Sequence, residues 1–381
     1  MPMRRIRLGM VGGGQGAFIG GVHRMAARLD DRFEFVSAAP SSDAARAQAS
    51  GIELGLDPQR VYADFRAMAV AEAERPDGIE VVAVVTPNHL HHAVAGAFID
   101  AGIHVICDKP LTRTLDEAID LVARVRKAGV LFGVTYTYSA YPMVRHAREL
   151  VESGALGDIR VVQVEYAQDW LAEDIETTGQ KQARWRTDPA LAGEGGCIGD
   201  IGTHAYHLAC FVTGLGVTQL AADLATFVAG RKVDDDAHVS LRFDNGARGH
   251  LWASQVATGC QNALALRVFG SKGSLSFRQE SPEELWYTPL GQPTQRLTRG
   301  GPSLGAAAAQ ATRIPGGHPE GYLEAFAQLY REMADQIEAR HAGRACVLAV
   351  PGVQAGAQGM HFVDAAIRSH RQGGAWVSLE A

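Results

Sequence analysis

The sequence predicts an α/β protein of two domains: a doubly wound parallel sheet, then an α+β domain with a large, mostly antiparallel, open-faced sheet. The chain has 381 residues, enough for two domains with buried cores. Strand and helix patterns alternate over residues 1–135, as in a parallel sheet with right-handed crossovers. Strand patterns dominate residues 136–381, so we place the domain boundary at residue 136.

The first domain is expected to contain five strands separated by helices. Strand patterns cover residues 7–11, 33–39, 78–85, 104–107 and 130–134. Helical patterns cover residues 19–29, 43–49, 64–73, 91–101 and 115–128. The third strand is mostly apolar, which is typical of a strand buried on both faces of a parallel sheet.

The second domain is expected to form one sheet with helices on a single face. A helical pattern covers residues 143–153, and strand patterns cover 159–170, 220–228, 237–243, 247–257, 263–269, 274–277 and 285–287. Asn245-Gly246 is a strong hairpin turn. Residues 291–317 are polar and expected to be irregular. Helices are expected at 320–339 and 353–369, and they are placed in the second domain or packed back on the first.

Charge and cysteine content narrow the class of protein. The formal net charge is −6 without acidic or basic blocks, which argues against nucleic acid and anionic membrane surfaces as partners. No apolar run is long enough to span a bilayer, and a strand follows residues 1–5 directly, so we expect no signal peptide. Five scattered cysteines favour reduced thiols, a cytoplasmic location and no zinc site.

A glycine cluster joins the first strand to the first helix. Gly12-x-Gly14-x-x-Ala17 has the spacing of a dinucleotide-binding loop, and it stands between a strand and a helix as that loop must. Gly12 permits a tight turn, Gly14 lets the backbone approach a pyrophosphate, and the N–H groups of the helix start face the anion. The pattern predicts a Rossmann domain that binds NAD or NADP; the alternative is a structural turn. The expected contacts are Gly12, Gly14, Gln15, Gly16, Ala17, Phe18 and Ile19.

The end of the second strand decides between NAD and NADP. An acidic residue about twenty positions past the glycines holds the ribose 2′-hydroxyl in NAD sites. Ser41 and Ser42 stand here instead, with Arg46 one helical turn further on. Hydroxyls and an arginine suit a 2′-phosphate, so we slightly favour NADP. The alternative is that Asp43 takes the acidic role, or caps the next helix.

Two stretches carry candidate catalytic groups. Lys109 directly follows the fourth strand, at the edge where open α/β sheets bind ligands; the alternative is a solvated surface lysine. Asp200 and His204 are four residues apart, so a helix beginning near residue 201 would point both side chains the same way. Histidine is the commonest general base near neutral pH. Alternatively, Asp200 is a helix cap and His204 a buried histidine. His207 lacks a third ligand nearby, so we expect no metal.

Weaker candidates flank these two stretches. Thr86-Pro87-Asn88 ends the third strand and, with His91, could line a nicotinamide crevice; the alternative is a helix start. Trp170, Trp185 and Arg186 flank a polar segment that could close on a sugar, with tryptophan stacking on its apolar face. The alternative for that segment is a subunit contact.

Together these motifs resemble the glucose–fructose oxidoreductase, inositol dehydrogenase and MocA (Gfo/Idh/MocA) family of sugar dehydrogenases. The matching motifs occur in the same order over nearly the whole chain: the glycine loop, Thr86-Pro87-Asn88 with His91, Asp108-Lys109-Pro110, Trp185-Arg186-x-Asp188-Pro189 and Gly199-Asp200-Ile201-Gly202-Thr203-His204. Two positions depart from the family pattern. Asp108 stands where the family usually has glutamate, and His207 where it often has aspartate.

The resemblance implies an NAD(P)-dependent dehydrogenase in which Lys109 and His204 are catalytic and Asp200 binds substrate. It also implies that Asp108, Lys109 and Arg186 lie at the cofactor, and that the open sheet forms a homodimer or homotetramer. The substrate is expected to be a cyclic polyol or pyranose, in contact with Tyr136, Tyr138, Trp170, Trp185 and His318. Two alternatives are an NAD-dependent glycoside hydrolase with tightly held cofactor and a catalytically silent NAD(P)-binding sensor.

Overall fold

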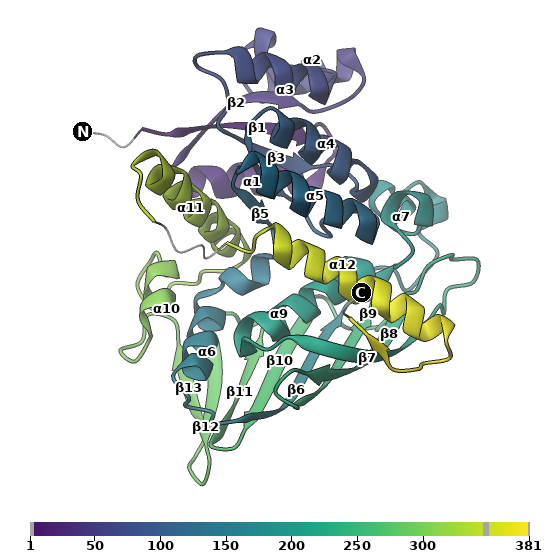
Figure 1. Cartoon of the computed structure of the whole chain (residues 1–381), viewed down its shortest axis with the longest axis vertical. Helices are drawn as coiled ribbons and strands as arrows, with labels where there is room; N and C mark the ends of the chain where they lie inside the picture. Colours follow the sequence, from purple (N-terminus) through teal and green to yellow (C-terminus); the bar gives the residue numbers. More distant parts are fainter. Residues whose placement is uncertain (1–3, 346–349, 380–381) are drawn as a thin grey trace. The chain divides into compact units, whose positions relative to one another are not determined.

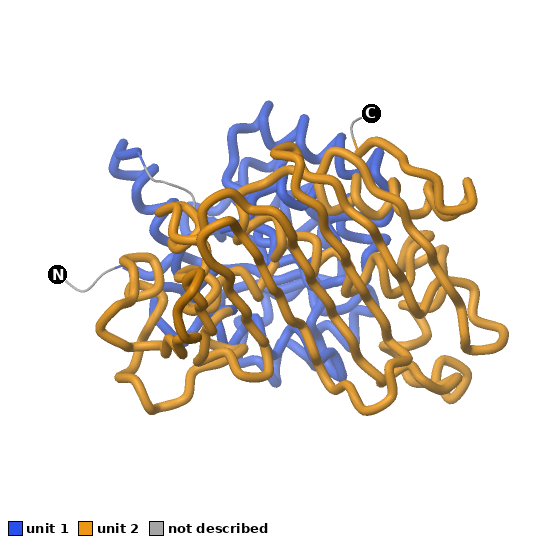
Figure 2. Tube along the Cα trace, turned by 90° about the horizontal axis from the view of Figure 1, so that it is seen from below, with its two compact units in different colours: residues 1–135, 326–357 blue, residues 136–325, 358–381 orange. Residues whose placement is uncertain are grey.

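The computed structural model describes residues 4–345 and 350–379, which form two compact units (Figures 1 and 2). The first unit takes the described residues up to Thr135 together with those of 326–357. The second takes those of 136–325 and 358–381. Each unit contains one sheet, and each is described below by itself.

The first unit contains a five-stranded parallel sheet in the order β2-β1-β3-β4-β5. Its strands are β1 (Ile6–Gly12), β2 (Phe33–Ala39), β3 (Val81–Val85), β4 (His104–Cys107) and β5 (Phe132–Val134). Its helices are α1 (Phe18–Leu29), α2 (Ala44–Glu53), α3 (Phe65–Glu74), α4 (Asn88–Asp100) and α5 (Leu115–Ala128), with most of α11 (Tyr322–His341). The doubly wound parallel sheet predicted from the sequence is therefore confirmed.

Local sequence explains the regularity of this unit. Every residue of β3 is buried, as its apolar sequence Val-Val-Ala-Val-Val requires. Helix α5 begins with a capping box between Thr114 and Glu117 and ends at Gly129, whose φ of 65° suits a residue without a side chain. Tyr330 of α11 packs edge-on against Phe33 of β2, which ties this late helix to the first unit.

The second unit contains a nine-stranded sheet in the order β13-β12-β11-β10-β6-β9-β8-β7-β14. Its strands are β6 (Ile159–Ala167), β7 (Val217–Ala225), β8 (Asp236–Phe243), β9 (Arg248–Ser254), β10 (Ala263–Gly270), β11 (Gly273–Arg278), β12 (Glu284–Pro289), β13 (Gln295–Thr298) and β14 (Val377–Ser378). Among these pairs only β6 and β9 run parallel. The mostly antiparallel sheet predicted for this half of the chain is confirmed.

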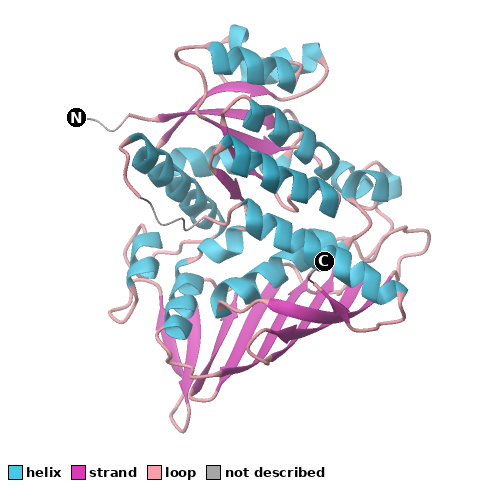
Figure 3. Cartoon of the chain, viewed as in Figure 1, coloured by secondary structure: helices cyan, strands magenta, loops and turns pink. Residues whose placement is uncertain are grey.

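The two faces of this sheet differ. Helices α6 (Pro142–Glu152), α9 (Thr203–Thr213) and the later part of α12 (Val353–Arg371) lie on one face (Figures 1 and 3). Along β8, Val239 and Leu241 are buried, whereas His238 and Ser240, which alternate with them, are exposed. The same alternation leaves Val161, Phe269 and Trp286 exposed on the uncovered face. The open-faced sheet expected from the sequence is thus present.

Some elements differ from the sequence-based expectation. Residues 291–317, expected to be irregular, contain β13 and helix α10 (Ala306–Ala311). The alanine-rich sequence of α10 favours a helix, and β13 is held by pairing with β12. Two short helices, α7 (Lys181–Arg186) and α8 (Pro189–Ala192), lie in the segment expected to be a polar loop.

The described helices are all too short or too polar to cross a membrane. Cys107, Cys197, Cys210 and Cys260 are free thiols, and Cys346 lies outside the described residues. The cytoplasmic location expected from the cysteine content stays a prediction.

Candidate active site

The glycine loop after β1 has a backbone that side chains would block. Gly12 has a φ of 86°, and a Cβ placed on it would lie 2.8 Å from the carbonyl oxygen of Val85. A Cβ on Gly14 would lie 2.7 Å from the carbonyl oxygen of Pro40. Ala17 stands at the N-cap of α1 without a side-chain cap, and the first turn of α1 has no acidic residue. This loop therefore fits a dinucleotide pyrophosphate at the start of α1.

The other residues expected at the cofactor in this region lie around the same loop. The main-chain N–H of Gln15 donates to Ser50, and its side chain donates to Glu53 of α2. Phe18, the first residue of α1, is exposed. Ser42 and Arg46 are exposed beyond the end of β2.

Asp43 caps helix α2. Its carboxylate accepts a hydrogen bond from the main-chain N–H of Arg46 at 2.8 Å, and its own N–H donates to the Ser41 hydroxyl. The capping role that the sequence left open for Asp43 is present, and Ser42 and Arg46 are exposed polar residues beside it.

A buried histidine joins the loops that follow β3 and β4. The Nε2 atom of His91 lies 2.8 Å from the carbonyl oxygen of Thr86, and its Nδ1 atom lies 2.9 Å from that of Pro110. Lys109 stands between β4 and Pro110, at the carboxyl edge of the sheet. His91 therefore ties the loop after β3 to the loop after β4 that carries Lys109.

Asp108 holds the same loop through two side-chain contacts. Its Oδ1 atom lies 3.1 Å from Nε2 of His23 and accepts a hydrogen bond from the Thr135 hydroxyl at 2.6 Å. His23 in turn contacts the Tyr330 hydroxyl through Nδ1 at 2.7 Å. Burial opposes ionisation of Asp108, but the charge and hydrogen bond of His23 and the hydrogen bond of Thr135 outweigh it and lower its pKa. These contacts therefore favour the carboxylate form of Asp108.

In the second unit, a wide π-helical turn at Ile198–Gly202 leads into α9 and carries Asp200. The carboxylate of Asp234 holds the start of this turn: it accepts hydrogen bonds from the N–H groups of Gly196 at 2.6 Å and Ile198 at 2.8 Å, and from the Cys197 thiol at 3.0 Å. Burial raises the pKa of Asp234, and these hydrogen bonds oppose the rise. Such wide turns often occur at functional sites.

Asp200 is held from two sides. The Gln255 side chain donates to Asp200 Oδ2 at 2.9 Å, and Nε of Arg186 lies 3.3 Å from the same oxygen. The Arg186 guanidinium also lies over the ring of Trp185 at 4.2 Å and over that of Trp170 at 5.9 Å. Four predicted residues, Asp200, Arg186, Trp185 and Trp170, are thus brought together.

His204 lies among tyrosine rings. The ring centroid of Tyr138 is 4.7 Å from that of His204, and those of Tyr136 and Tyr166 are 5.7 and 6.1 Å away. Tyr136 also stacks on His207 with the rings 4.1 Å apart. Burial, with Arg145 and Arg148 nearby, lowers the pKa of His207 to about 3, so His207 is a neutral packing group behind His204.

Sequence reasoning missed three residues of this cluster: Asp234, Gln255 and Tyr166. The run Asp234-Asp235-Asp236, which leads into β8, is a signal, because three buried carboxylates in a row need specific partners. His318, a predicted substrate contact, is exposed on a loop after α10. Within the described ranges, histidine, cysteine and carboxylate side chains nowhere form the group of three that could hold a metal ion.

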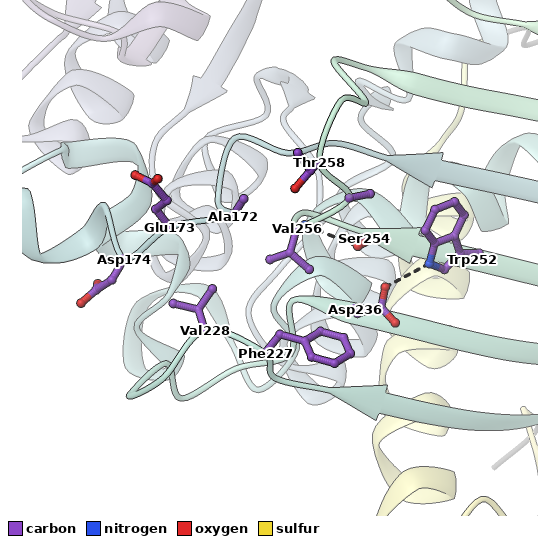
Figure 4. A pocket seen from close by; sticks show the side chains of 11 residues that line it. Ala172, Glu173, Asp174, Phe227, Val228, Asp236, Trp252, Ser254, Val256 and Thr258 are labelled. Atoms are coloured by element: carbon purple, nitrogen blue, oxygen red, sulfur yellow. Dashed lines mark hydrogen bonds between the residues drawn. The ribbon is translucent and has the colours of Figure 1, made fainter.

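Figure 4 shows a cavity of the second unit, lined by side chains of β8, of β9 and of the loops beside them. This cavity of about 510 Å³ has apolar walls from Phe227, Val256 and Trp252 and is flanked by Glu173 and Asp236. The Trp252 indole donates to Asp236 at 3.0 Å. Trp252 alternates along β9 with the buried Leu251 and Ala253, which places its indole on the uncovered face of the sheet.

The fold and these side chains define a class: a Rossmann domain joined to a sheet domain that presents a histidine and an aspartate one turn apart. The comparisons agree. Residues 6–136 match the family described as "Oxidoreductase family, NAD-binding Rossmann fold", and residues 144–276 match the "GFO/IDH/MocA C-terminal domain". The chain belongs to the Gfo/Idh/MocA family of NAD(P)-dependent oxidoreductases.

Relatives with known structures or activities cover most of the chain. An oxidoreductase from Sinorhizobium meliloti is 51% identical, with a TM-score of 0.90, over 98% of this chain and 100% of that chain. An inositol dehydrogenase homologue from Azotobacter vinelandii, in complex with NADH and myo-inositol, is 36% identical with a TM-score of 0.92 over 98% of each chain. Levoglucosan dehydrogenase from Pseudarthrobacter phenanthrenivorans is 30% identical over 74% of this chain and 76% of that protein.

Replacing Asp108 by asparagine should destabilise the protein at pH 7 by about 1–3 kcal/mol, because the amide gives His23 and Thr135 a weaker acceptor. The folded-state pKa of Asp108 lies below its unfolded value, so its contribution is present above the unfolded pKa and lost as pH falls through the folded one. The difference between wild type and Asp108→Asn should therefore shrink below about pH 4. Urea unfolding at several pH values measures it.

The exposed Asp223 gives a matched control, because Asp223→Asn makes the same charge change without a buried partner. Its effect should stay within about 0.5 kcal/mol. An equal loss in both variants, or a loss for Asp108→Asn that is as large at pH 3 as at pH 7, would contradict the role assigned to this carboxylate.

Proposed function

We propose that this protein transfers a hydride between a nicotinamide dinucleotide and a ring carbon of a cyclic polyol or pyranose, with His204 as general acid/base and Lys109 stabilising the alkoxide. The observation that carries the proposal is the cluster in the second unit, where Asp200 lies one turn before His204 and is fixed by Gln255 and Arg186. Family membership supports the redox chemistry. The myo-inositol and levoglucosan of the two relatives support the substrate class.

The chain's own residues account for the proton and the charge. A bound nicotinamide supplies or accepts the hydride. His204 removes the proton from the substrate hydroxyl as the hydride leaves the same carbon, and returns it in the reverse direction. The Lys109 ammonium donates a hydrogen bond to the same oxygen and stabilises its developing negative charge. Asp200 accepts a hydrogen bond from a neighbouring hydroxyl.

Several side chains would give the substrate site its preference for a ring. Trp170 and Trp185 offer flat apolar surfaces on which the C–H face of a sugar or inositol can stack. Tyr138 lies directly beside His204. Tyr136 and His318 stay predicted substrate contacts, as do Thr86, Pro87, Asn88 and His91 at the cofactor.

Replacing Lys109 by alanine should lower kcat/KM by about 10²–10³ while leaving the Kd for dinucleotide within about threefold, because the ammonium acts mainly on transition-state charge. The assay follows absorbance at 340 nm with myo-inositol, levoglucosan and glucose. Lys127→Ala removes an exposed lysine at the end of α5 and should behave as wild type. A Lys109→Ala enzyme with the parental rate would disprove the role of Lys109.

The same assay separates the alternative functions. Tight dinucleotide binding without net turnover, but with release of nitrophenol from nitrophenyl glycosides, would identify a glycoside hydrolase. Binding without any reaction would identify a sensor.

For the cofactor we propose NADP over NAD, on the exposed Ser42 and Arg46 and the commitment of Asp43 to a helix cap. The structure of the inositol dehydrogenase homologue contains NADH, so both cofactors belong in the test. Arg46→Ala should raise the Kd for NADPH about tenfold through loss of a charge-assisted contact, and leave that for NADH unchanged. Arg66→Ala, at an exposed arginine on α3, is the control. Tighter binding of NADH than NADPH by wild type would refute this preference.

We further propose that the uncovered sheet face joins subunits into a homodimer or homotetramer. Phe269 and Val161 are cross-strand partners on that face, and each is 38% exposed. Such neighbouring apolar side chains on a sheet face are suited to an interface. Light scattering should give a multiple of 40.7 kDa for wild type and a smaller mass for Phe269→Glu. Ile52→Glu, on an exposed position of α2, should not change the mass; a monomeric wild type would exclude the proposal.

A further inference from the structure

A chain of hydrogen bonds runs through the second unit to the tyrosine beside His204. The Trp170 indole N–H donates to Gln168 Oε1 at 3.1 Å, and Gln168 Nε2 donates to Asn262 Oδ1 at 2.7 Å. The Tyr166 hydroxyl lies 2.7 Å from the same Asn262 oxygen and 2.5 Å from the Tyr138 hydroxyl. On the other side, Asn262 Nδ2 donates to Gln279 Oε1 at 3.1 Å, and Gln279 Nε2 donates to the Tyr141 hydroxyl at 3.2 Å.

The direction of every bond in this chain follows from one group. An indole N–H can only donate, so the Gln168 atom facing Trp170 must be the amide oxygen. The Gln168 NH₂ group then faces Asn262, which must present its oxygen there and its own NH₂ group to Gln279. Trp170 therefore sets the orientation of three side-chain amides in succession.

The two tyrosine hydroxyls are oriented by the same argument. The Asn262 oxygen carries no proton, so the Tyr166 hydroxyl must donate to it. Having used its only proton, Tyr166 must accept from Tyr138. Tyr138 has thereby used its own proton as well, and its oxygen can only accept a hydrogen bond from any further group. Asn262 Nδ2, at 3.5 Å, is a marginal donor to that oxygen.

We propose that this chain makes Tyr138 an obligate hydrogen-bond acceptor for the substrate, so that the enzyme selects a ring bearing a free hydroxyl at the position facing Tyr138. Gln168 and Asn262 are then positioning residues that determine specificity without contacting the reacting carbon. The inference rests on the proposed function, because it places a polyol beside His204, whose ring centroid is 4.7 Å from that of Tyr138. Deoxy and fluoro analogues at that ring position cannot donate and are rejected.

The Gln168→Glu substitution should reverse the direction of the hydrogen bonds that lead from residue 168 to Tyr138. Above the ordinary glutamate pKa of about 4.3, the introduced carboxylate still accepts from Trp170 but cannot donate to Asn262. Asn262 must then turn its NH₂ group toward this carboxylate and Tyr166. The position of the new carboxylate oxygen, 3.5 Å from the Tyr166 hydroxyl, is at best a marginal acceptor for it. Tyr166 therefore accepts from Asn262 and donates to Tyr138, which is left with a proton for the substrate. Gln279→Glu adds the same charge and still accepts from Asn262. Only its bond with Tyr141 reverses, so the direction from Asn262 through Tyr166 to Tyr138 is kept.

The assay compares kcat/KM at pH 8 for the best substrate among myo-inositol, levoglucosan and glucose with its set of monodeoxyfluoro analogues. Wild type and Gln279→Glu should prefer hydroxyl over fluorine by about 10–100-fold at one ring position beyond the reacting carbon. Gln168→Glu and Tyr138→Phe should reduce that preference to within about threefold. An undiminished preference for hydroxyl over fluorine in Gln168→Glu would overturn the proposal. A general loss of activity without a change in that preference would show only a structural role and would overturn it too.

A measurement that needs no turnover tests this inference independently of the proposed function. A neutron crystal structure of the wild-type protein shows deuterium positions directly. Deuterium on Tyr138 directed at Tyr166, and on Tyr166 directed at Asn262, supports the chain; the opposite directions refute it. If wild type turned over none of the three substrates while the deuterium positions held, the proposed substrate class would fail and the acceptor role of Tyr138 would stand.

Discussion

The second unit depends on one buried carboxylate. Asp234 binds the N–H groups of Gly196 and Ile198 with its two oxygens and so fixes where the segment carrying Asp200 and His204 begins. The approach is close enough that a Cβ on Gly196 would lie 2.0 Å from the main-chain oxygen of Asp234. Because Asp200 follows within one turn and His204 one turn later, an error in this single contact would displace both groups. A buried carboxylate needs several hydrogen-bond donors to offset its desolvation, and those donors fix the backbone that carries them.

In the first unit, polar side chains likewise hold loops at the carboxyl edge of the sheet. Parallel strands end in loops that have no ladder to hold them, so side chains from elsewhere must do so. His91 joins the loops after β3 and β4, and Asp108 is held by His23 and Thr135. Asp108 shows that the shorter acid reaches its partners here, where the family usually has glutamate. His207 stands three residues after His204, where the family often has aspartate. It packs on Tyr136 as a neutral ring.

Much of the fold could be predicted because its causes are local. The alternation of strand and helix, the apolar β3 and the Asn245-Gly246 hairpin follow from neighbouring residues, and all appear in the structure. The strand β13 could not be foreseen, because its residues become a strand only by pairing with β12. The cap made by Asp43 was one of two interpretations, and it became visible only from the position of the Arg46 N–H. Gln255 gave no signal at all, since a glutamine is informative only when its partner is known.

The sequence by itself determined the class of this protein, because a glycine loop after a strand, a lysine after β4, and an aspartate and histidine four residues apart occur together in the order of the family that they resemble. Each motif alone left an alternative open. Only the tertiary structure decided what surrounds them. Trp170, Gln168 and Asn262 acquire a common direction because β6 and β10 are adjacent, although Gln168 and Asn262 are 94 residues apart in the chain. The physical reason is that hydrogen-bond direction is a property of a connected network, and the connections exist only once the sheet has formed.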